Sequence, residues 1–414
     1  MGESTLSPIA STLDPAEAMA ALGTPAGRAN PYPIYEALRA HGPVLNLGPL
    51  AVLTGYEECA RALREPAFVS TDPTMRDRLV PGWREQPAWR SICTTMLFHN
   101  DPIHERLRRF STTPFSPTAV SAMRPMLERL TEAAVDRVEK LGAGGEPVEF
   151  MDTFACRLPL AVMGELLGIP PEEQPAIQPL LRPVTEGLDP FGDPALLTSA
   201  NHAVEELAAY FADLVARRRA TPEQDLVSAF AKARDDGADL SEDELIATYM
   251  VLLVAGTAAP FDLVGNTMAL AARHPEHADR VREDPELAAA FVEEGFRYDP
   301  AVQVLNRVVA EDIEYFGVPL PAGTAVLLLI AAGNRDPRRF DAPGRFDPSR
   351  PNVQPLTFGL GAHYCLGSAL GRLEGAIALN ALVRRFPNPV IHGEPTYRDQ
   401  LVQRGFETFH IRVS

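Results

Sequence analysis

Residues 357–367 read TFGLGAHYCLG, and a long apolar helical pattern follows them. One cysteine, Cys365, therefore stands where a glycine-punctuated loop turns into a helix. Gly359 and Gly361 allow the backbone to adopt positive φ and to approach a flat group closely. Backbone N–H groups at the start of a helix favour the thiolate form of a nearby cysteine. A thiolate held in this way is either a metal ligand or a nucleophile.

The composition of the chain excludes several classes of protein. It has 414 residues, of which 46% are hydrophobic and 22% charged, as is typical of a globular protein with a large core. The formal net charge of −17 argues against nucleic acid or an anionic membrane as the main partner. The four cysteines are scattered without a CxxC pair, so no zinc site or disulfide framework is indicated. The polar N-terminus and the short apolar runs predict a soluble, cytoplasmic protein.

Hydrophobic periodicity predicts a mainly α-helical chain with small β-sheets, an α+β class in which strands occur near the start and after residue 300. Residues 1–30 are rich in Ser, Thr, Pro and Gly and predict a partly ordered leader, whereas 31–414 predict a single domain. Residues 43–55 predict a β-hairpin that turns near Gly48. Residues 321–337 predict a tight turn, a buried strand and a short helix.

The segment 245–272 is a long and almost entirely apolar helical pattern, which is typical of a core helix. Pro260 lies inside it and cannot donate a hydrogen bond to the carbonyl of Gly256. We therefore expect the helix to kink or open around 256–260. A simple break between two helices is the alternative, although the apolar pattern continues through Met268.

Two pairs of charged residues have helical spacing. Glu294 and Arg297 lie at i and i+3 between apolar neighbours, which favours a partly buried ion pair with Arg350 as a third partner. His104 and Arg108 lie at i and i+4 and share a helix face. By itself, the second pair is typical of a solvated basic helix.

Together these segments resemble the cytochrome P450 family of haem-thiolate monooxygenases, and in particular its soluble bacterial members. FGLGAHYCLG fits the haem-binding loop of the family at Phe358, Gly359, Cys365 and Gly367, and His363 is also usual there. Glu294-x-x-Arg297 matches the ExxR motif, while AGNRDP and FDPSR resemble the segments that precede the loop. The similarity runs from about Pro31 to the C-terminus. It implies the P450 fold, with haem between the long central helix and the helix after the cysteine loop.

The resemblance also implies haem b as the cofactor and Cys365 as the axial ligand of its iron. Thiolate ligation favours cleavage of the O–O bond, which fits this role. Four side chains correspond to the family's contacts to the two haem propionates, namely His104, Arg108, Arg307 and His363. Glu294, Arg297 and Arg350 correspond to a buried structural triad.

The chain departs from the family in its central helix. Family members usually carry an acid and an alcohol there, and this pair orders the water that delivers protons during oxygen activation. Here Ala258 and Ala259 occupy these two positions, and Pro260 follows. Thr257 is a candidate substitute alcohol, although one residue along a helix rotates it by about 100°.

Three hypotheses account for this atypical oxygen-activation region. A substrate hydroxyl with ordered water completes the proton relay, or the reaction is a radical coupling or ring closure, or the enzyme uses peroxide. The Arg-Pro pair of known peroxygenases is missing, and we favour the substrate-assisted route.

The matched positions predict a substrate pocket with small side chains over the haem. Its residues come from the central helix, the strand after ExxR and the C-terminal turn after Gly405: Leu252, Ala255, Ala258, Ala259, Val304, Leu305 and Phe406. The segments 71–98 and 184–198 are expected to cover its entrance. A bulky, mostly apolar substrate fits such a pocket, and macrolide, polyketide or peptide-derived natural products are the candidates.

We therefore expect a monooxygenase that uses O2 to hydroxylate or epoxidise a bulky secondary metabolite. A P450 that catalyses oxidative coupling or ring closure is the first alternative. A non-catalytic P450-like binding domain is the second, although Cys365 and the propionate contacts are all present. Electrons are expected from a separate ferredoxin and ferredoxin reductase. Arg106, Arg109 and Arg372 form either a docking face for the ferredoxin or a merely solvated face.

Overall fold

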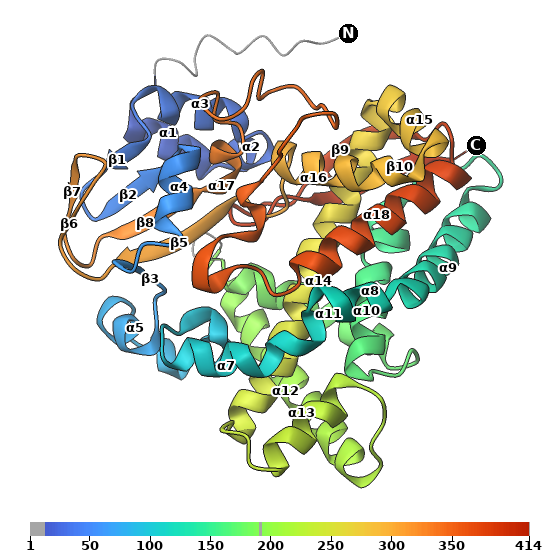
Figure 1. The fold of residues 1–414 in the computed structure, drawn as a ribbon, viewed down its shortest axis with the longest axis horizontal. Coiled ribbons are helices and arrows are strands. Elements are labelled where there is room, and N and C mark those ends of the chain that lie inside the picture. Colours follow the sequence, from blue (N-terminus) through green and yellow to red (C-terminus); the bar gives the residue numbers. More distant parts are fainter. Residues whose placement is uncertain (1–12, 190–192, 414) are drawn as a thin grey trace. The chain divides into compact units, whose positions relative to one another are not determined.

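The computed structural model describes residues 13–189 and 193–413, which form two compact units. The first unit contains the residues up to Ser70, Glu293–Cys365 and Thr396–Glu407. The second contains Thr71–Val292, Leu366–Pro395 and the residues from Thr408 onward. The predicted class, mainly α with small sheets, is confirmed (Figure 1). The single domain expected for 31–414 stays a prediction.

A five-stranded sheet lies in the first unit, in the order β1-β2-β8-β5-β3. Its strands come from two distant parts of the chain, so blue and orange arrows lie side by side in Figure 1. They are β1 (Val44–Asn46), β2 (Leu50–Leu53), β3 (Phe68–Val69), β5 (Val304–Val309) and β8 (Ala325–Leu329). β1 and β2 form the predicted hairpin, with Gly48 at φ +84°. The predicted turn, strand and short helix are also confirmed, since β8 leads into α17 (Ile330–Gly333). A separate two-stranded sheet pairs β6 (Ile313–Tyr315) with β7 (Val318–Leu320).

The helices of the first unit begin inside the expected leader, of which residues 1–12 lie outside the described part of the chain. They are α1 (Pro15–Leu22), α2 (Pro25–Ala29), α3 (Tyr32–Ala40) and α4 (Tyr56–Ala62). α1 starts with a capping box, in which the Asp14 carboxylate accepts from the Glu17 N–H (2.8 Å) and Glu17 accepts from the Asp14 N–H (3.1 Å). Leu22 then packs in one core cluster with Tyr35 and Leu38. Capping and burial together explain why Pro15–Leu22 is helical.

The second unit is built mainly of helices. They are α5 (Pro73–Leu79), α6 (Pro87–Cys93), α7 (Ile103–Thr112), α8 (Pro117–Ala122), α9 (Arg124–Gly142), α10 (Arg157–Leu167), α11 (Gln174–Gly187), α12 (Leu196–Ala220), α13 (Leu226–Asp235), α14 (Glu242–Arg273), α15 (Pro275–Glu283) and α18 (Ser368–Arg385). α16 (Ala288–Tyr298) starts in this unit and ends in the first. β4 (Val148–Glu149), β10 (Phe406–Arg412) and β9 (Val390–Tyr397) form a three-stranded sheet, in which His410 and Ile411 pair with Glu149 and Val148.

α14 is one helix of 32 residues that contains Pro260, so the predicted opening around 256–260 is wrong, and so is the alternative of a break between two helices. The predicted kink stays a prediction. Its first turn is fixed by a capping box, in which Ser241 Oγ accepts from the Glu244 N–H (3.1 Å) and Glu244 Oε2 accepts from the Ser241 N–H (2.8 Å). The residues from Asp262 to Ala271 are all buried. Burial of the turns on both sides therefore outweighs the one backbone hydrogen bond that Pro260 removes.

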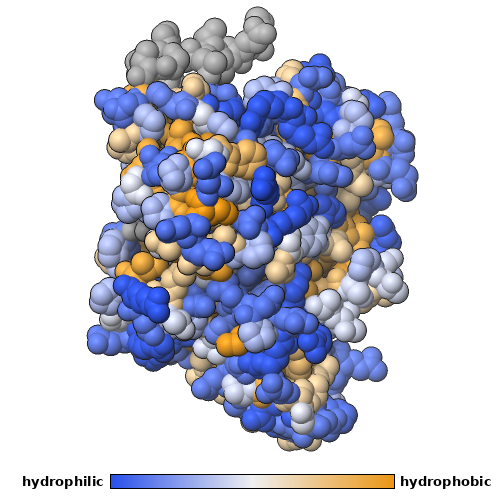
Figure 2. Space-filling model, turned by 60° about the vertical axis from the view of Figure 1, so that its left-hand side comes forward, coloured by the Kyte–Doolittle hydropathy of each residue, from blue (hydrophilic) through white to orange (hydrophobic). Residues whose placement is uncertain are grey.

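α14 is also the only described helix that is long and apolar enough to cross a membrane. However, 56% of its most apolar stretch is buried within the protein. The face of the molecule in Figure 2 is mostly hydrophilic, with apolar residues in scattered patches. α14 therefore has the character of a core helix.

Candidate functional site

The cysteine loop is held in place by its own backbone. Gly359 and Gly361 adopt φ of +65° and +71°, as the sequence predicts. A Cβ on Gly361 would lie 2.4 Å from the Leu63 carbonyl oxygen, so only glycine fits there. The Cys365 N–H donates to the Phe358 carbonyl oxygen over 2.8 Å. Cys365 itself is exposed, so the loop presents its sulfur from a fixed backbone.

Asn334 ties the cysteine loop to the end of α16, a role that the sequence alone did not indicate. Its side-chain amide donates to the Phe296 carbonyl oxygen and to Thr357 Oγ1, each over 3.2 Å, and its oxygen accepts from the Leu356 N–H over 2.7 Å. The ring of Phe358 packs edge-on against that of Phe296, with 4.7 Å between the ring centres. The sequence feature that could have indicated this role is the position of Asn334 in AGNRDP, directly after the predicted short helix.

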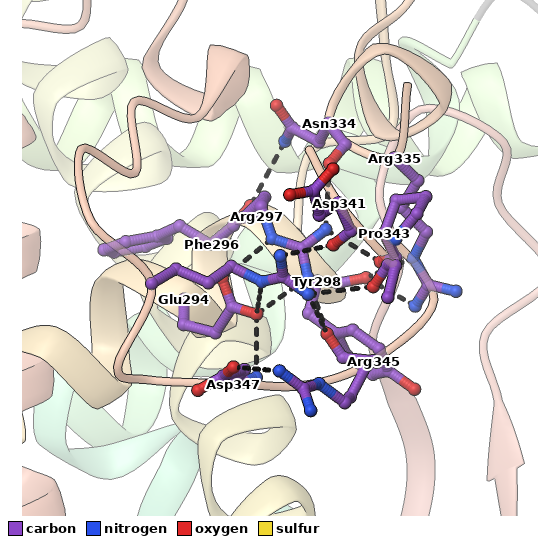
Figure 3. A network of polar contacts seen from close by, with 12 residues as sticks. Glu294, Phe296, Arg297, Tyr298, Asn334, Arg335, Asp341, Pro343, Arg345 and Asp347 are labelled. Atoms are coloured by element: carbon purple, nitrogen blue, oxygen red, sulfur yellow. Dashed lines mark hydrogen bonds and ion pairs between the residues drawn. The ribbon is translucent and has the colours of Figure 1, made fainter. Parts of the chain in front are cut away.

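Glu294, Arg297 and Arg350 form the ion-paired cluster that their spacing predicts. Arg297 donates from Nε and Nη2 to the two oxygens of Glu294 (2.8 and 2.7 Å), and both side chains are fully buried (Figure 3). Arg350 Nε donates to the same carboxylate over 3.1 Å. Arg297 Nη1 also donates to the carbonyl oxygens of Asn334 (3.0 Å) and Pro343 (2.8 Å). Because a buried ion pair needs such additional hydrogen bonds, this cluster holds the loops around it in one arrangement.

Arg307 is a cation without an acidic partner among the described residues. It lies on β5, and its Nη1 donates to the Asn306 carbonyl oxygen over 2.7 Å. Burial lowers the pKa of its guanidinium to about 10. A desolvated cation of this kind is stabilised by an anion. His363, in the same unit, has its Nε2 3.3 Å from Ser70 Oγ.

His104 and Arg108 lie on α7 in the second unit and share a helix face, as predicted. His104 is buried, and its Nδ1 lies 3.2 Å from a carboxylate oxygen of Asp101. Arg108 is half-buried. The helix therefore offers two nitrogen-bearing side chains side by side.

The arginines considered for a docking face are mostly engaged within the protein. Arg106 pairs with Glu244 over 2.5 Å, which joins α7 to the start of α14. Arg109 pairs with Glu105 over 3.0 Å on the surface of α7. Arg372 donates to the Ser368 carbonyl oxygen over 3.4 Å.

The centre of α14 has an open, alanine-lined side and a buried side. Ala255 is exposed and Ala258, Ala259 and Pro260 are half-buried. Thr257 is buried, and its hydroxyl donates to the Leu253 carbonyl oxygen over 2.8 Å. The hydroxyl is thus bonded to the helix itself and lies on the other side from the alanines, as its rotation along the helix predicts. On this segment, the open face carries neither a carboxylate nor a hydroxyl.

The remaining predicted pocket residues are largely buried. Leu252 and Val304 are buried and Leu305 is half-buried. Phe406 is buried with its ring centre 4.7 Å from that of Tyr397.

Of the two segments expected to cover the entrance, 71–98 contains the short helices α5 and α6. The segment 184–198 includes the end of α11 and the start of α12, and residues 190–192 lie outside the described part of the chain.

One buried acid was not predicted from the sequence. Glu374 on α18 is 2% exposed, and its Oε1 has no hydrogen-bond partner among the described residues. Burial alone raises the pKa of its carboxyl group to about 8. Its neighbour Gly375 packs against Val292 and Leu263, so this side of α18 is apolar. No local signal marks Glu374, since only the packed structure shows that its side chain is buried.

Comparison with known proteins identifies the family of the chain. Residues 59–401 match the family model described as Cytochrome P450. The chain is 35% identical over 399 residues to 6-deoxyerythronolide B hydroxylase of Saccharopolyspora erythraea, which covers 92% of this chain and 96% of that protein. It is 34% identical over 400 residues to vitamin D(3) 25-hydroxylase of Pseudonocardia autotrophica, covering 93% and 94%. The ligand-free crystal structure of Mycobacterium smegmatis CYP164A2 matches with a TM-score of 0.86 and 35% identity, over 96% of this chain and 99% of that one.

Proposed function

Because the chain belongs to the cytochrome P450 family and is a monooxygenase with haem b as its cofactor, we propose that it hydroxylates or epoxidises a bulky natural product of the macrolide or polyketide type. The observation that carries this proposal is the open face of α14, where Ala255, Ala258 and Ala259 leave room for a large, mostly apolar substrate. Two of the relatives are named as hydroxylases, which supports hydroxylation as the reaction.

The residues present fit a bound haem b. Cys365, exposed on its fixed loop, would ligate the iron, while Phe358, Gly359 and Gly367 shape the backbone that lies against the ring. Arg307 is the observation that tests the fit, because this half-buried cation has no acidic partner among the described residues and suits a propionate. Three further side chains would contact the two propionates, namely His104, Arg108 and His363. When bound, haem b with a thiolate ligand activates O2 and supplies one oxygen atom to the substrate.

The proton route is the part of the mechanism that is particular to this chain. Ala258 and Ala259 carry no proton donor, Pro260 has no N–H, and the Thr257 hydroxyl already donates to the Leu253 carbonyl oxygen. A hydroxyl group of the substrate, together with ordered water, therefore takes the place of the missing acid and alcohol.

The chain acts in the cytoplasm and receives its electrons from a separate ferredoxin and ferredoxin reductase. The absence of a flavin or iron–sulfur motif in the sequence supports separate electron carriers.

The haem assignment is tested by the CO-difference spectrum of the reduced protein. We expect the Soret band of a thiolate-ligated haem, and its loss in a folded Cys365→His variant. A Soret band of a non-thiolate haem in the correctly folded parent protein would overturn the Cys365 assignment.

The substrate and the proton route are tested together. Macrolides and polyketides are screened for a low- to high-spin shift, and the product of each binder is identified. A binder is then compared with its analogue that lacks the hydroxyl nearest the oxidised carbon. We expect the analogue to consume NADPH with little product formation, and tightly coupled oxidation of the analogue would contradict the substrate-assisted route.

A further inference from the structure

Arg76 lies in an aromatic corner of the second unit, formed by α5, α6 and the short helix Met96–Phe98. Its Cζ is 3.9 Å from the ring centre of Trp89 and 5.3 Å from that of Phe98. The two rings meet edge-to-face at 88° with 6.2 Å between their centres. The arginine side chain is only 6% exposed, so these rings replace much of the water around its charge.

The charge of Arg76 has no acidic counterpart among the described residues. Three other buried arginines form ion pairs with acids, namely Arg297 with Glu294, Arg218 with Asp225 and Arg404 with Asp299. Burial lowers the pKa of Arg76, and only the neighbouring Cys93 thiol opposes this effect. That thiol is no counterion, because burial raises its pKa to about 11 and keeps it neutral.

The acids nearest in sequence are already engaged. Asp72 accepts from the Met75 N–H (2.9 Å) and from the side chain of Asn100 (3.2 Å). Asp77 pairs with Arg84 over 2.7 Å. Meanwhile Arg76 Nε has no hydrogen-bond partner among the described residues. A desolvated guanidinium whose Nε–H is buried without a partner is energetically costly unless an anion balances its charge.

The corner rests on the helix that carries the alanine face. The Ala88 N–H at the start of α6 donates to Asn201 of α12 over 3.0 Å. Ser91, also on α6, lies 3.9 Å from the sulfur of Met250 on α14. Met250 precedes Ala258 by eight residues, which corresponds to about 12 Å along a helix. A substrate of natural-product size is therefore long enough to extend from the neighbourhood of Met250 to Ala258.

We propose that Arg76, held between Trp89 and Phe98, binds the carboxylate of an otherwise apolar substrate. This inference rests on the proposed function and narrows its substrate to molecules that carry an acid group at one end. Arg suits this role because its planar fork binds a carboxylate through two parallel hydrogen bonds. The other source of a carboxylate is the propionate of the haem, which the experiment must separate from the substrate.

The experiment compares matched acids and methyl esters by spectral titration of the haem-loaded protein. The panel contains straight-chain, aromatic and macrocycle-derived acids, each with its ester. We expect at least one acid to bind the parent protein about tenfold to a hundredfold more tightly than its ester, as a charge-assisted hydrogen bond provides. Arg76→Met removes this preference and leaves the affinity of the ester within about twofold.

Arg90→Met is the matched control, since Arg90 lies on the same segment but is exposed. It retains the acid preference. Arg76→Lys controls for misfolding of the Arg76→Met variant. Lysine keeps the positive charge, so this variant should retain part of the preference for the acid. The CO-difference spectrum of each variant reports separately on the haem-thiolate assignment, so a failure of that assignment is distinguishable from a failure of this proposal.

Two results would overturn the proposal. The first is that no acid in the panel binds the parent protein more tightly than its ester, or that the Arg76→Met variant still binds the acid more tightly than the ester. The second is accelerated loss of haem from Arg76→Met with an unchanged acid preference, which assigns the carboxylate to the cofactor.

Discussion

Replacing Glu374 by glutamine should stabilise the protein at alkaline pH and have little effect at acidic pH. The Glu374 side chain is 2% exposed, and burial alone raises the pKa of its carboxyl group from 4.5 to about 8. The folded protein therefore keeps this proton to a higher pH than the unfolded chain. Below about pH 4.5 both states are protonated, and the residue makes stability neither rise nor fall with pH.

Between about pH 4.5 and pH 8 the unfolded chain loses the proton first, so the stability of the parent protein falls as pH rises. A pKa difference of 3.5, from 8 − 4.5, corresponds to about 5 kcal/mol over the whole interval. From about pH 6 to pH 8 alone, the fall is about 2 to 3 kcal/mol. For a chain of 414 residues this corresponds to a shift in melting temperature of about 3 °C. Glutamine never ionises, so Glu374→Gln lacks this fall.

The measurement is calorimetric melting of the haem-loaded parent and Glu374→Gln proteins at several pH values, with the CO-difference spectrum checked in each. We expect the melting temperatures to converge near pH 5 and to separate by about 3 °C or more near pH 8. Glu286→Gln is the control, because Glu286 is exposed and its replacement should shift nothing. If the melting temperatures of the parent and Glu374→Gln proteins differ by the same amount at all pH values, Glu374 is not a buried carboxyl group with a raised pKa.

Three further predictions concern the buried network and α14. Arg297→Lys should destabilise the protein by about 3 to 5 kcal/mol, measured as loss of folded yield or melting temperature, because lysine cannot replace all the hydrogen bonds of the guanidinium. Gly256→Ala should cost about 1 kcal/mol in the same measurement, because the new Cβ would lie 2.5 Å from Met163 Sδ, whereas the same replacement made in a Met163→Ala protein should cost almost nothing relative to that protein. Thr257→Val should leave the ratio of product to NADPH unchanged, since the hydroxyl is bonded to the Leu253 carbonyl oxygen, and a marked drop would contradict this placement.

Features that depend on local chemistry could be predicted from the sequence. Gly359 and Gly361 adopt positive φ, because few other residues tolerate it in a tight loop. The hairpin at Gly48 follows from apolar runs on either side of a turn. The pairing of Glu294 with Arg297 follows from their spacing and their apolar neighbours.

Features that depend on tertiary burial could not be predicted. Pro260 is a local signal for an opened helix, yet the helical hydrogen bonding of α14 continues around it because the neighbouring turns are buried. Residues Pro15–Leu22 form α1 inside the expected leader, since Leu22 packs in one core cluster with Tyr35. Neither partner segment can be identified from the local pattern. For the same reason, nothing in the sequence around Glu374 indicates a buried acid.

The buried charges divide into two kinds, and this division bears most directly on function. The charge of Arg297 is balanced inside the protein by Glu294, so it stabilises the chain without any ligand. Arg307 and Arg76 are desolvated but have no acidic partner among the described residues, so folding alone does not balance their charges. A desolvated cation of this kind costs stability unless a partner balances its charge. We propose that a haem propionate balances the charge of Arg307 and that the acid group of a substrate balances the charge of Arg76.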